Sequence, residues 1–276
     1  MFSLNCKGKL VLIEKPLVMG ILNITPDSFY AGSRLQNMDT ILTKARQMIA
    51  EGADILDIGG QSTRPGSERI SEEEEIEKVL PVIEMLIKEF DPVILSVDTY
   101  HAAVAKEAVN AGASIVNDIS GGAMGKNMLE TVASLGVPYI CMHMKGVPET
   151  MHHDTSYENI LKEILDFFIK KLDECRLAGI KDVIVDPGFG FGKTIQHNFT
   201  LLKNLSIFKI LEMPLMAGLS RKSTIYKTLK IDAENSLNGT TVLNTLALQN
   251  GANILRVHDV KEAKETVTLF QAYANA

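Results

Sequence analysis

Polar side chains end several apolar runs of this chain, and their types suit the recognition of a flat, nitrogen-rich ligand. Asp98, Asn117 and Asp186 each stand at or near the end of such a run. Two carboxylates and an amide can bind the donor and acceptor edge of a heterocycle that carries an amidine-like or guanidine-like group. We therefore expect a site for such a ring where these runs end.

Two later runs end in side chains of the opposite character. Arg256 and His258 are two residues apart, as are Ser220 and Lys222, and the two-residue period of a strand puts each pair on one face. The chain has a net charge of −6, so an anionic ligand must be met by local cations. Surface ion pairs are an equally open role for these cations taken alone. Their position favours anion binding, a frequent function of the last two loops of an α/β barrel.

The elements that would position these side chains are eight buried strand-like runs separated by helix-like stretches. Near-continuous Val, Ile and Leu runs are typical of parallel strands that are covered on both faces. Their alternation with helices predicts an α/β fold, a (β/α)8 TIM barrel whose active-site face lies at the carboxyl ends of the strands. The runs are residues 17–23, 54–63, 93–98, 114–118, 139–143, 183–186, 215–222 and 254–259.

A short N-terminal β-hairpin is predicted before the barrel, because apolar residues 2–4 and 10–13 flank a polar turn at 5–9. We expect it to close the bottom of the barrel. No low-complexity linker divides the chain, so a single domain over residues 1–276 is predicted. The acidic run 71–75 is interpreted as a solvated, capped helix start. The predicted helices are 40–51, 71–89, 101–111, 127–135, 156–178, 197–208 and 234–250.

The glycine-rich segment 186–194 resembles a phosphate-binding loop but lacks the required spacing. Pro187 stands where the Walker pattern needs its first glycine, and Lys193 where the dinucleotide fingerprint needs its last. A carboxylate followed by a tight, flexible loop remains, which suits close backbone approach to a flat ligand. The histidines have no metal-binding spacing, and a structural or solvent-facing role is the simpler interpretation of His143, His152 and His153.

Composition limits the other classes. The net charge is unlike the excess of Lys and Arg in most nucleic-acid-binding domains, and 46% hydrophobic residues suffice for a barrel core. Cys6, Cys141 and Cys175 have no metal-binding pattern and are interpreted as thiols. Charged residues interrupt the apolar residues of the N-terminus, so neither a secretory signal nor a membrane span is predicted, and the cytoplasm is expected.

Seven short segments make the sequence similar to the dihydropteroate synthases. They occur in family order across almost the whole chain, and their joint occurrence is specific. The segments are MGILNITPDSF (19–29), DIGGQSTRPG (57–66), SVDT (96–99), IVNDIS (115–120), DPGFGFGK (186–193), GLSRKS (218–223) and RVHDV (256–260). The resemblance implies a reaction of folate biosynthesis, in a family that sulfonamides target. The reaction joins p-aminobenzoate to the methylene carbon of a 7,8-dihydropterin diphosphate and expels pyrophosphate.

Carried over by position, the resemblance assigns the recognition of the pterin ring to four residues. These are Asp98, Asn117, Asp186 and Lys222. Asn23 would ligate the cofactor Mg²⁺, which can take much of its coordination shell from phosphate and water.

The same resemblance divides the remaining positions between two subsites. Arg256 and His258 would hold the pyrophosphate. The p-aminobenzoate subsite would be formed by Thr63, Arg64, Pro65 and Ser220, with Phe191 as an apolar wall. The residues expected to act in catalysis are Asp98, Lys222, Arg256 and His258.

The implied mechanism is departure of pyrophosphate before attack by the amine. Mg²⁺, Arg256 and His258 would neutralise the charge of the leaving group, while Asp98 would favour the cation on the methylene carbon. Segments 25–37 and 62–69 are predicted to be lids, although passive surface loops fit the same composition. Gln61 stands where the family usually has Glu, and an amide can replace that carboxylate with little loss.

Two other classes remain open. A pterin-binding methyltransferase that serves a corrinoid protein would share the barrel but would not need segment 62–65 or the pair Arg256 and His258. A pterin-binding barrel without catalysis would be expected to lose these cations. The resemblance also implies a homodimer, and residues 241–248 offer an apolar helical surface for it. Packing against the barrel explains the same residues equally well.

Overall fold

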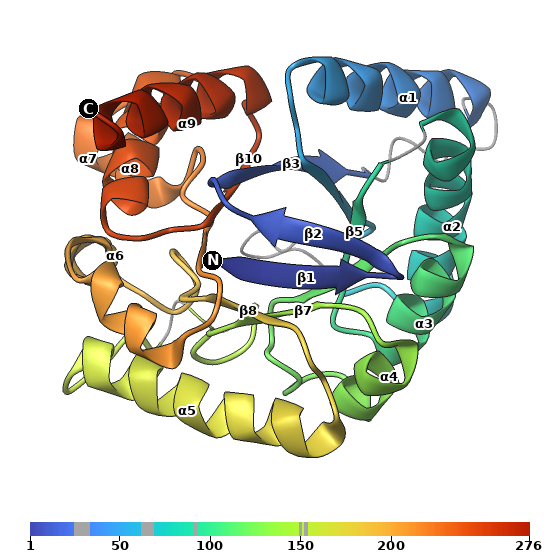
Figure 1. Cartoon of the computed structure of the whole chain (residues 1–276), viewed down its shortest axis with the longest axis horizontal. Helices are drawn as coiled ribbons and strands as arrows, with labels where there is room; N and C mark the ends of the chain where they lie inside the picture. The colour runs from blue at the N-terminus through green and yellow to red at the C-terminus, as the bar shows by residue number, and fades with distance from the viewer. Residues whose placement is uncertain (25–33, 62–68, 91–92, 149–150, 152–153) are drawn as a thin grey trace.

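Eight parallel strands form a nearly closed barrel in the computed structural model, and helices cover its outside (Figure 1). The described residues are all except 25–33, 62–68, 91–92, 149–150 and 152–153. The barrel strands are β3 (Leu17–Asn23), β4 (Ile55–Gly59), β5 (Leu95–Asp98), β6 (Ile115–Asp118), β7 (Tyr139–Met142), β8 (Val183–Asp186), β9 (Met216–Ala217) and β10 (Ile254–Val257). They pair in the order β8-β7-β6-β5-β4-β3-β10-β9, and a parallel bridge between Val185 and Leu215 links the two ends. The predicted (β/α)8 barrel is confirmed.

Helices alternate with these strands, as right-handed crossovers between parallel strands require. Gly136 and Gly179 end two helices in left-handed conformations, and both ends were predicted. Of the described helices, none is long and apolar enough to span a membrane. The helices are α1 (Arg34–Ala50), α2 (Glu72–Glu89), α3 (Ala102–Ala111), α4 (Met128–Leu135), α5 (Ile160–Ala178), α6 (Ile195–Lys203), the 3₁₀ helix η2 (Leu205–Leu211), α7 (Ser223–Leu229), α8 (Leu237–Gln249) and α9 (Val260–Ala274).

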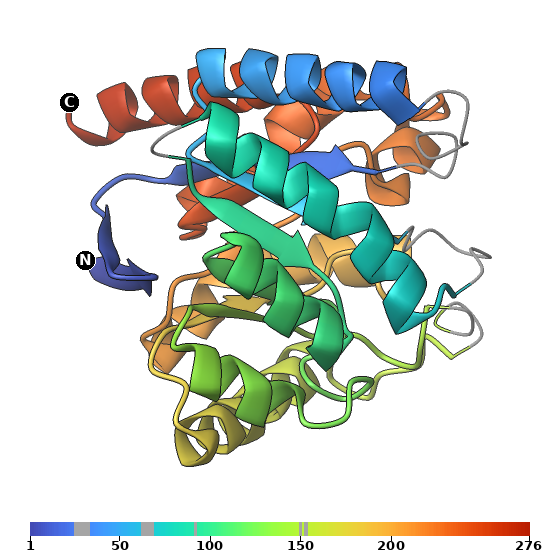
Figure 2. The same cartoon turned by 90° about the vertical axis from the view of Figure 1, so that its right-hand side faces the viewer.

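The predicted N-terminal hairpin closes the bottom of the barrel. Its antiparallel strands are β1 (Phe2–Cys6) and β2 (Lys9–Ile13), and Figure 2 shows them at the end of the molecule opposite to the tip of β3. Leu4 and Cys6 pack in one apolar cluster with the first inward-facing residues of the barrel strands, among them Ile55 and Ile254. The hairpin therefore forms part of the barrel core.

Inward-facing side chains change from apolar to polar along the strands. Alternate residues of a strand share one face. The residues two positions after the apolar bottom layer are polar on several strands, and the pairs are Ile55 and Asp57, Ile94 and Ser96, Ile115 and Asn117, Ile184 and Asp186, and Ile254 and Arg256. The polar residues form a layer near the carboxyl ends, which we call the polar layer.

Four local predictions are wrong. The strand predicted at 54–63 ends at Gly59. The strand predicted at 215–222 ends at Ala217. It cannot continue to Lys222, because Arg221 has a φ of +54°, which is not an extended conformation. The helix predicted at 197–208 consists of α6 and η2, which Asn204 separates. Finally, the acidic run 71–75 is not solvated throughout, because Glu75 is buried. Ser71 does accept the predicted capping hydrogen bond from Glu74 N.

Candidate active site

Four strand ends meet in register on one side of the barrel. Asn23 of β3 pairs with Gly59 of β4, Gly59 pairs with Asp98 of β5, and Asp98 pairs with Asn117 of β6. A β-carbon on Gly59 would lie 3.4 Å from Asn23 Oδ1 and 3.8 Å from Asp98 Oδ2. Because glycine adds no side chain there, the space between the carboxamide and the carboxylate stays open.

Arg256 connects the predicted ring-binding residues with the predicted anion-binding residues. Its Nε donates to Asp57 Oδ2 at 2.7 Å, and its Nη2 donates to Asp98 Oδ2 at 2.5 Å. Asn117 Nδ2 donates to the same oxygen of Asp57 at 3.0 Å. The two groups that the sequence suggested as separate therefore form one network inside the polar layer.

Asp57 is a site residue that the sequence analysis did not single out. Its side chain is fully buried, and its Oδ1 has no hydrogen-bond partner among the described residues. A carboxylate inside a strand that is buried on both faces is costly unless it is paired, and this would have been the signal. Asp57 lies two residues before the end of β4, whereas the sequence pattern pointed to polar residues at the ends of the apolar runs.

Lys222 lies in the turn that follows β9, near Asp186 at the end of β8. Its Nζ donates to Phe189 O at 2.5 Å and lies 4.8 Å from the centre of the Phe191 ring. A β-carbon on Gly218 would lie 3.7 Å from Lys222 Nζ and 4.0 Å from Asp186 Oδ2, so this glycine also keeps the layer open. The ammonium, the carboxylate and the Phe191 ring thus border one space, although the resemblance assigned Phe191 to a different subsite from Asp186 and Lys222.

Burial and charge set the protonation of this cluster. Burial raises the pKa values of Asp98 and Asp186, while Arg256 and Lys222 respectively oppose that change. Burial lowers the pKa of Lys222 to about 8, against the attraction of Asp186. Burial also acts to lower the pKa of Arg256, but Asp57 and Asp98 outweigh it and raise that pKa. Both cations are therefore charged at neutral pH.

Ser220 and His258 join the two last βα turns. Ser220 Oγ and His258 Nδ1 are 3.1 Å apart, and His258 N donates to Ser220 Oγ at 3.1 Å. Burial, followed by the charge of Arg256, lowers the pKa of His258 to about 4. His258 is therefore neutral at pH 7 and can offer a hydrogen bond, but no positive charge, to an anion.

Lys193 organises the loop after β8, a role that the sequence analysis did not assign. Its buried Nζ donates to Gly188 O at 2.9 Å and Phe191 O at 3.0 Å, and lies 3.0 Å from His143 Nδ1. A β-carbon on Gly188, whose φ is +69°, would lie 2.0 Å from His143 O. The loop that carries Phe191 is thus fixed from within, and His143 has the structural role that was considered simplest.

Several predicted residues lie outside the described part of the chain. These are Thr63, Arg64, Pro65, His152 and His153, together with most of the two predicted lids at 25–37 and 62–69. Gln61 is described and accepts a hydrogen bond from Tyr100 OH at 2.9 Å. A glutamate could accept the same bond, so the amide preserves this contact.

Asn23 is the predicted metal ligand, and its surroundings leave room for a Mg²⁺ ion that keeps most of its non-protein ligands. No group of three or more His, Cys, Asp or Glu among the described residues could hold a metal ion. Asn23 is exposed beside the space that Gly59 leaves open, and it offers one neutral oxygen. Such a site suits an ion that takes most of its ligands from phosphate and water.

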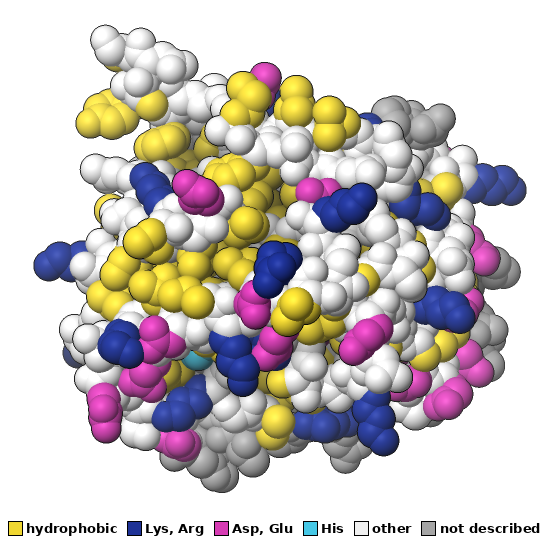
Figure 3. All heavy atoms as spheres, turned by 60° about the horizontal axis from the view of Figure 1, so that its bottom comes forward, with side chains coloured by type: hydrophobic (Ala, Val, Ile, Leu, Met, Phe, Trp, Pro, Cys, Tyr) yellow, Lys and Arg dark blue, Asp and Glu magenta, His cyan; other side chains and the backbone are white. Residues whose placement is uncertain are grey.

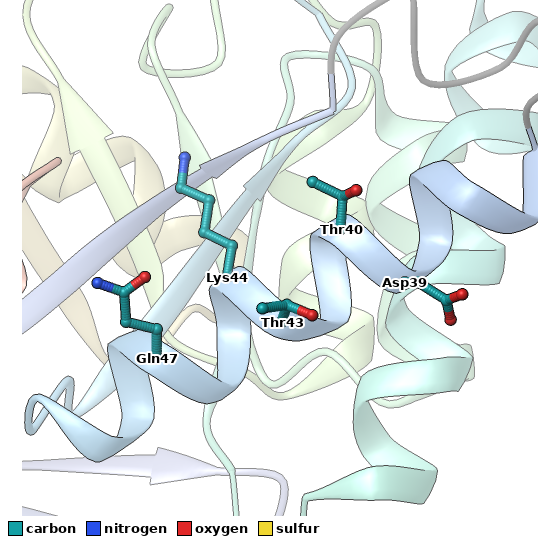
Figure 4. A pocket seen from close by; sticks show the side chains of 5 residues that line it. All are labelled: Asp39, Thr40, Thr43, Lys44 and Gln47. Carbon is teal, nitrogen blue, oxygen red and sulfur yellow. The ribbon is translucent and has the colours of Figure 1, made fainter.

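A separate pocket of 390 Å³ lies along α1 (Figure 4). It contains none of the residues of the polar layer, and all of its lining comes from one exposed helix face. The lining residues are Asp39, Thr40, Thr43, Lys44 and Gln47. Its position on one helix gives no reason to assign it to the candidate site.

Comparisons with known proteins agree with this geometry. The model of the family described as pterin binding enzyme matches residues 19–258. The dihydropteroate synthase of Haemophilus influenzae is 43% identical over 276 residues, covering 99% of this chain and all of the relative. The crystal structure of the Yersinia pestis enzyme with a sulfonamide drug superposes with a TM-score of 0.93, at 42% identity and full coverage of both chains. That of the Xanthomonas albilineans enzyme in complex with 7,8-dihydropteroate has a TM-score of 0.87, at 34% identity and 99% coverage of both. The chain therefore belongs to the pterin-binding enzyme family, among its dihydropteroate synthases.

Proposed function

We propose that this chain condenses p-aminobenzoate with a 7,8-dihydropterin diphosphate, giving 7,8-dihydropteroate and pyrophosphate, as a step of folate biosynthesis. The observation that carries the proposal is the polar layer together with Asp98 and Lys222, because carboxylates, an amide, an arginine and a lysine thereby surround one space at the carboxyl ends of the strands. The names of the relatives support the same reaction.

In this proposal the pterin ring lies between Asp98, Asn117, Asp186 and Lys222. Carboxylate and carboxamide oxygens would accept hydrogen bonds from the amino group and ring N–H groups, and the ammonium of Lys222 would donate to a carbonyl oxygen or ring nitrogen. The Phe191 ring, 4.8 Å from Lys222 Nζ, would provide the apolar wall of the adjoining p-aminobenzoate subsite. The Asp98 carboxylate would also lie near the methylene carbon at which the reaction occurs.

The diphosphate would be held by Arg256 and His258. Arg256 carries the positive charge and His258 a neutral N–H, since burial keeps the pKa of His258 near 4. An entering dianion would raise that pKa. Asn23 would be the protein ligand of Mg²⁺, which when bound supplies positive charge to the leaving diphosphate.

Departure of pyrophosphate would come first, because the electron-rich dihydropterin stabilises positive charge on the methylene carbon. The carboxylates Asp57 and Asp98, which Arg256 bridges, would provide negative charge near that cation. The aromatic amine would then attack from the side of Ser220, with Thr63, Arg64 and Pro65 completing its subsite. No strong base is needed, because an arylamine loses its proton readily once it has formed the new bond.

The test is product formation by the purified protein. With the dihydropterin diphosphate, p-aminobenzoate and Mg²⁺, we expect equal amounts of dihydropteroate and pyrophosphate. Omission of Mg²⁺ or the change Lys222→Met should abolish turnover. Lys145→Met is the matched control, since Lys145 also approaches an aromatic ring, that of Tyr157 at 4.8 Å, but belongs to another loop.

Other outcomes would favour the alternatives. Pterin binding without product would indicate a barrel that has lost catalysis. Transfer of a methyl group from a methylated tetrahydrofolate to a corrinoid protein would indicate the methyltransferase. Absence of pterin binding would contradict the assignment of the site itself.

We also infer one domain over residues 1–276, a cytoplasmic protein and a homodimer. The hairpin contributes to the barrel core, which supports a single domain. All three cysteines are free and buried, as expected in a reducing compartment. On the face in Figure 3, Lys and Arg side chains are interspersed with Asp and Glu, without the one-sign stripe typical of nucleic-acid binding.

For the dimer, α8 offers an exposed apolar surface. Leu243 and Leu248 of the predicted segment 241–248 pack inward, whereas Val242 and Leu246 are exposed. A second exposed set, with Ile210 of η2, belongs to the side near α5, where apolar side chains gather in Figure 3. Sedimentation should report a dimer that Val242→Glu converts to a monomer and that the control Ile210→Glu leaves intact. The opposite pattern would assign the interface to η2.

A further inference from the structure

Arg221 occupies an unusual position between two proposed site residues, Ser220 and Lys222. Its φ is +54°, in the left-handed region that residues with side chains rarely adopt. Such a conformation persists only where the surroundings hold it in place. The backbone N–H of Arg221 donates to Thr240 Oγ1 of α8 at 3.1 Å, which fixes the turn from one side.

The side chain of Arg221 joins three segments of the chain. Its Nε and Nη2 donate to the two carboxylate oxygens of Asp259 at 2.9 and 2.7 Å. Its Nη1 donates to Ala233 O at 3.1 Å and Glu234 O at 2.6 Å. One guanidinium thus ties the turn after β9 to the turn after β10 and to the connection between α7 and α8. A bidentate arginine–carboxylate pair fixes orientation as well as distance.

Arg221 and Asp259 are the residues that follow Ser220 and His258, which form the contact between the two last βα turns. Asp259 follows His258 in the chain, and Ser220 Oγ lies 3.1 Å from His258 Nδ1. Among the described residues, the side-chain hydrogen bonds of Arg221 and Asp259 do not reach the polar layer. Any influence on substrates must therefore pass through their neighbours Ser220, Lys222 and His258.

We propose that Arg221 and Asp259 are a positioning pair, which sets the spacing between Ser220 and Lys222 on one turn and His258 and Arg256 on the other. This inference rests on the proposed function, in which these two turns hold the aromatic amine and the diphosphate. The ion pair keeps both turns in the arrangement that diphosphate binding requires. Lysine cannot replace Arg221, because one ammonium cannot reproduce a planar fork that contacts both Asp259 and the carbonyl groups of residues 233 and 234.

The test compares Arg221→Met, Asp259→Asn and the double variant in the full-length protein. Binding of inorganic pyrophosphate is measured by calorimetry with Mg²⁺, and kcat and KM are measured for both substrates. If the residues acted only through their charges, loss of Arg221 would weaken anion binding and loss of Asp259 would strengthen it. A positioning pair predicts that each single change weakens pyrophosphate binding about tenfold or more, and that the double variant is no weaker than the worse single one.

Controls separate positioning from general stability. Lys264 and Asp54 form a pair of the same length, 2.7 Å, and similar exposure, and it links α9 to the start of β4 near the barrel bottom. Lys264→Met and Asp54→Asn should leave pyrophosphate binding and turnover unchanged while thermal unfolding reports any loss of stability. Arg221→Lys should not restore binding. If Arg221→Met does not fold, pyrophosphate binding by Asp259→Asn tests the proposal, because this change keeps the shape of the side chain.

The outcomes are distinguishable from failure of the proposed function. A wild-type protein that makes no dihydropteroate would contradict the proposed function. Pyrophosphate binding by the wild type and the variants would still test the positioning role of Arg221 and Asp259. Stronger pyrophosphate binding by Asp259→Asn, additive effects of the two changes, or an equal effect of the Lys264 control would each overturn the positioning pair.

Discussion

Lys222 is the residue at which burial and proposed function oppose each other most directly. In the proposed binding mode the pterin ring needs the ammonium, yet burial lowers the pKa of Lys222 to about 8. The protonated form, and with it ring binding, is present below that pH and is lost as the pH rises through 8. We expect kcat/KM for the pterin substrate to fall about tenfold per pH unit above that value.

The change Lys222→Arg tests this origin of the alkaline decrease. Arginine stays protonated throughout, so its lower maximal kcat/KM should persist to higher pH. The measurement is the pH profile of kcat/KM for both proteins under the same conditions. An unchanged alkaline decrease in the arginine variant would show that another group causes it.

Asp57 leads to a second prediction, on stability. Asp57→Asn removes one of the two negative charges that hold Arg256 and leaves a buried amide group with incomplete hydrogen bonding. We expect the free energy of unfolding to fall by about 2 kcal/mol, measured by denaturant titration. The control Asp54→Asn removes a carboxylate from a more exposed pair, 2.7 Å from Lys264, and should cost about 0.5 kcal/mol or less. Equal effects would mean that burial of the Asp57 pair has no energetic consequence.

At the scale of elements, the sequence predicted the strands better than the turns. Asp98, Asn117, Asp186 and Arg256 stand on strands whose apolar runs and two-residue period are visible locally, and the structure brings them together. The turn of Ser220 and Lys222 was mistaken for strand, because residue types do not reveal that Arg221 adopts a left-handed conformation. That conformation depends on contacts with Asp259 and Thr240, which are distant in the chain.

Asp57 and Lys193 escaped prediction for a similar reason. The partners of Asp57 are Arg256, 199 residues away, and Asn117, 60 residues away, and Lys193 approaches His143 from 50 residues away. Contacts of that kind depend on closure of the barrel and leave no local pattern. The acidic run before α2 misled in the opposite direction, since capping explained Glu72 to Glu74 but not the buried Glu75.

Helix α2 carries a third prediction, through that Glu75. Its side chain is 1% exposed, accepts a hydrogen bond from Thr99 Oγ1 at 3.2 Å, and has one oxygen without a partner among the described residues. Burial raises its pKa to about 8. Between pH 4.5, the ordinary pKa, and pH 8 the folded state binds the proton of Glu75 more tightly than the unfolded state does. The stability that this proton contributes to the folded state is therefore full below pH 4.5 and is lost as the pH rises through 8.

Glu75→Gln should remove this pH dependence. Between pH 5 and pH 9, the free energy of unfolding of the variant is expected to rise by about 2 kcal/mol or more relative to that of the wild type. All other groups titrate in both proteins, so the difference isolates Glu75. Parallel stability curves would contradict a buried, protonated Glu75.

At the scale of the whole molecule, the two ends of the barrel have different tasks. The polar layer lies at the carboxyl ends of the strands, and hairpin β1–β2 closes the other end with apolar side chains (Figure 2). In barrels of this type the carboxyl end carries chemistry and the opposite end carries stability. Substitutions in the hairpin should therefore change unfolding without changing turnover.

Leu4 tests this division of tasks. It is 1% exposed within the bottom cluster, whereas Leu12 on the paired strand is 48% exposed. Leu4→Ala should lower the free energy of unfolding by about 3 kcal/mol, because it removes buried methyl groups and leaves a cavity. Leu12→Ala, the matched control, should change it by about 0.5 kcal/mol or less. Denaturant unfolding gives both values, and kcat/KM per folded molecule should equal that of the wild type in both variants. A change in KM for either substrate in Leu4→Ala would mean that packing at the bottom of the barrel reaches the polar layer, and the two ends would then have to be treated as one coupled core.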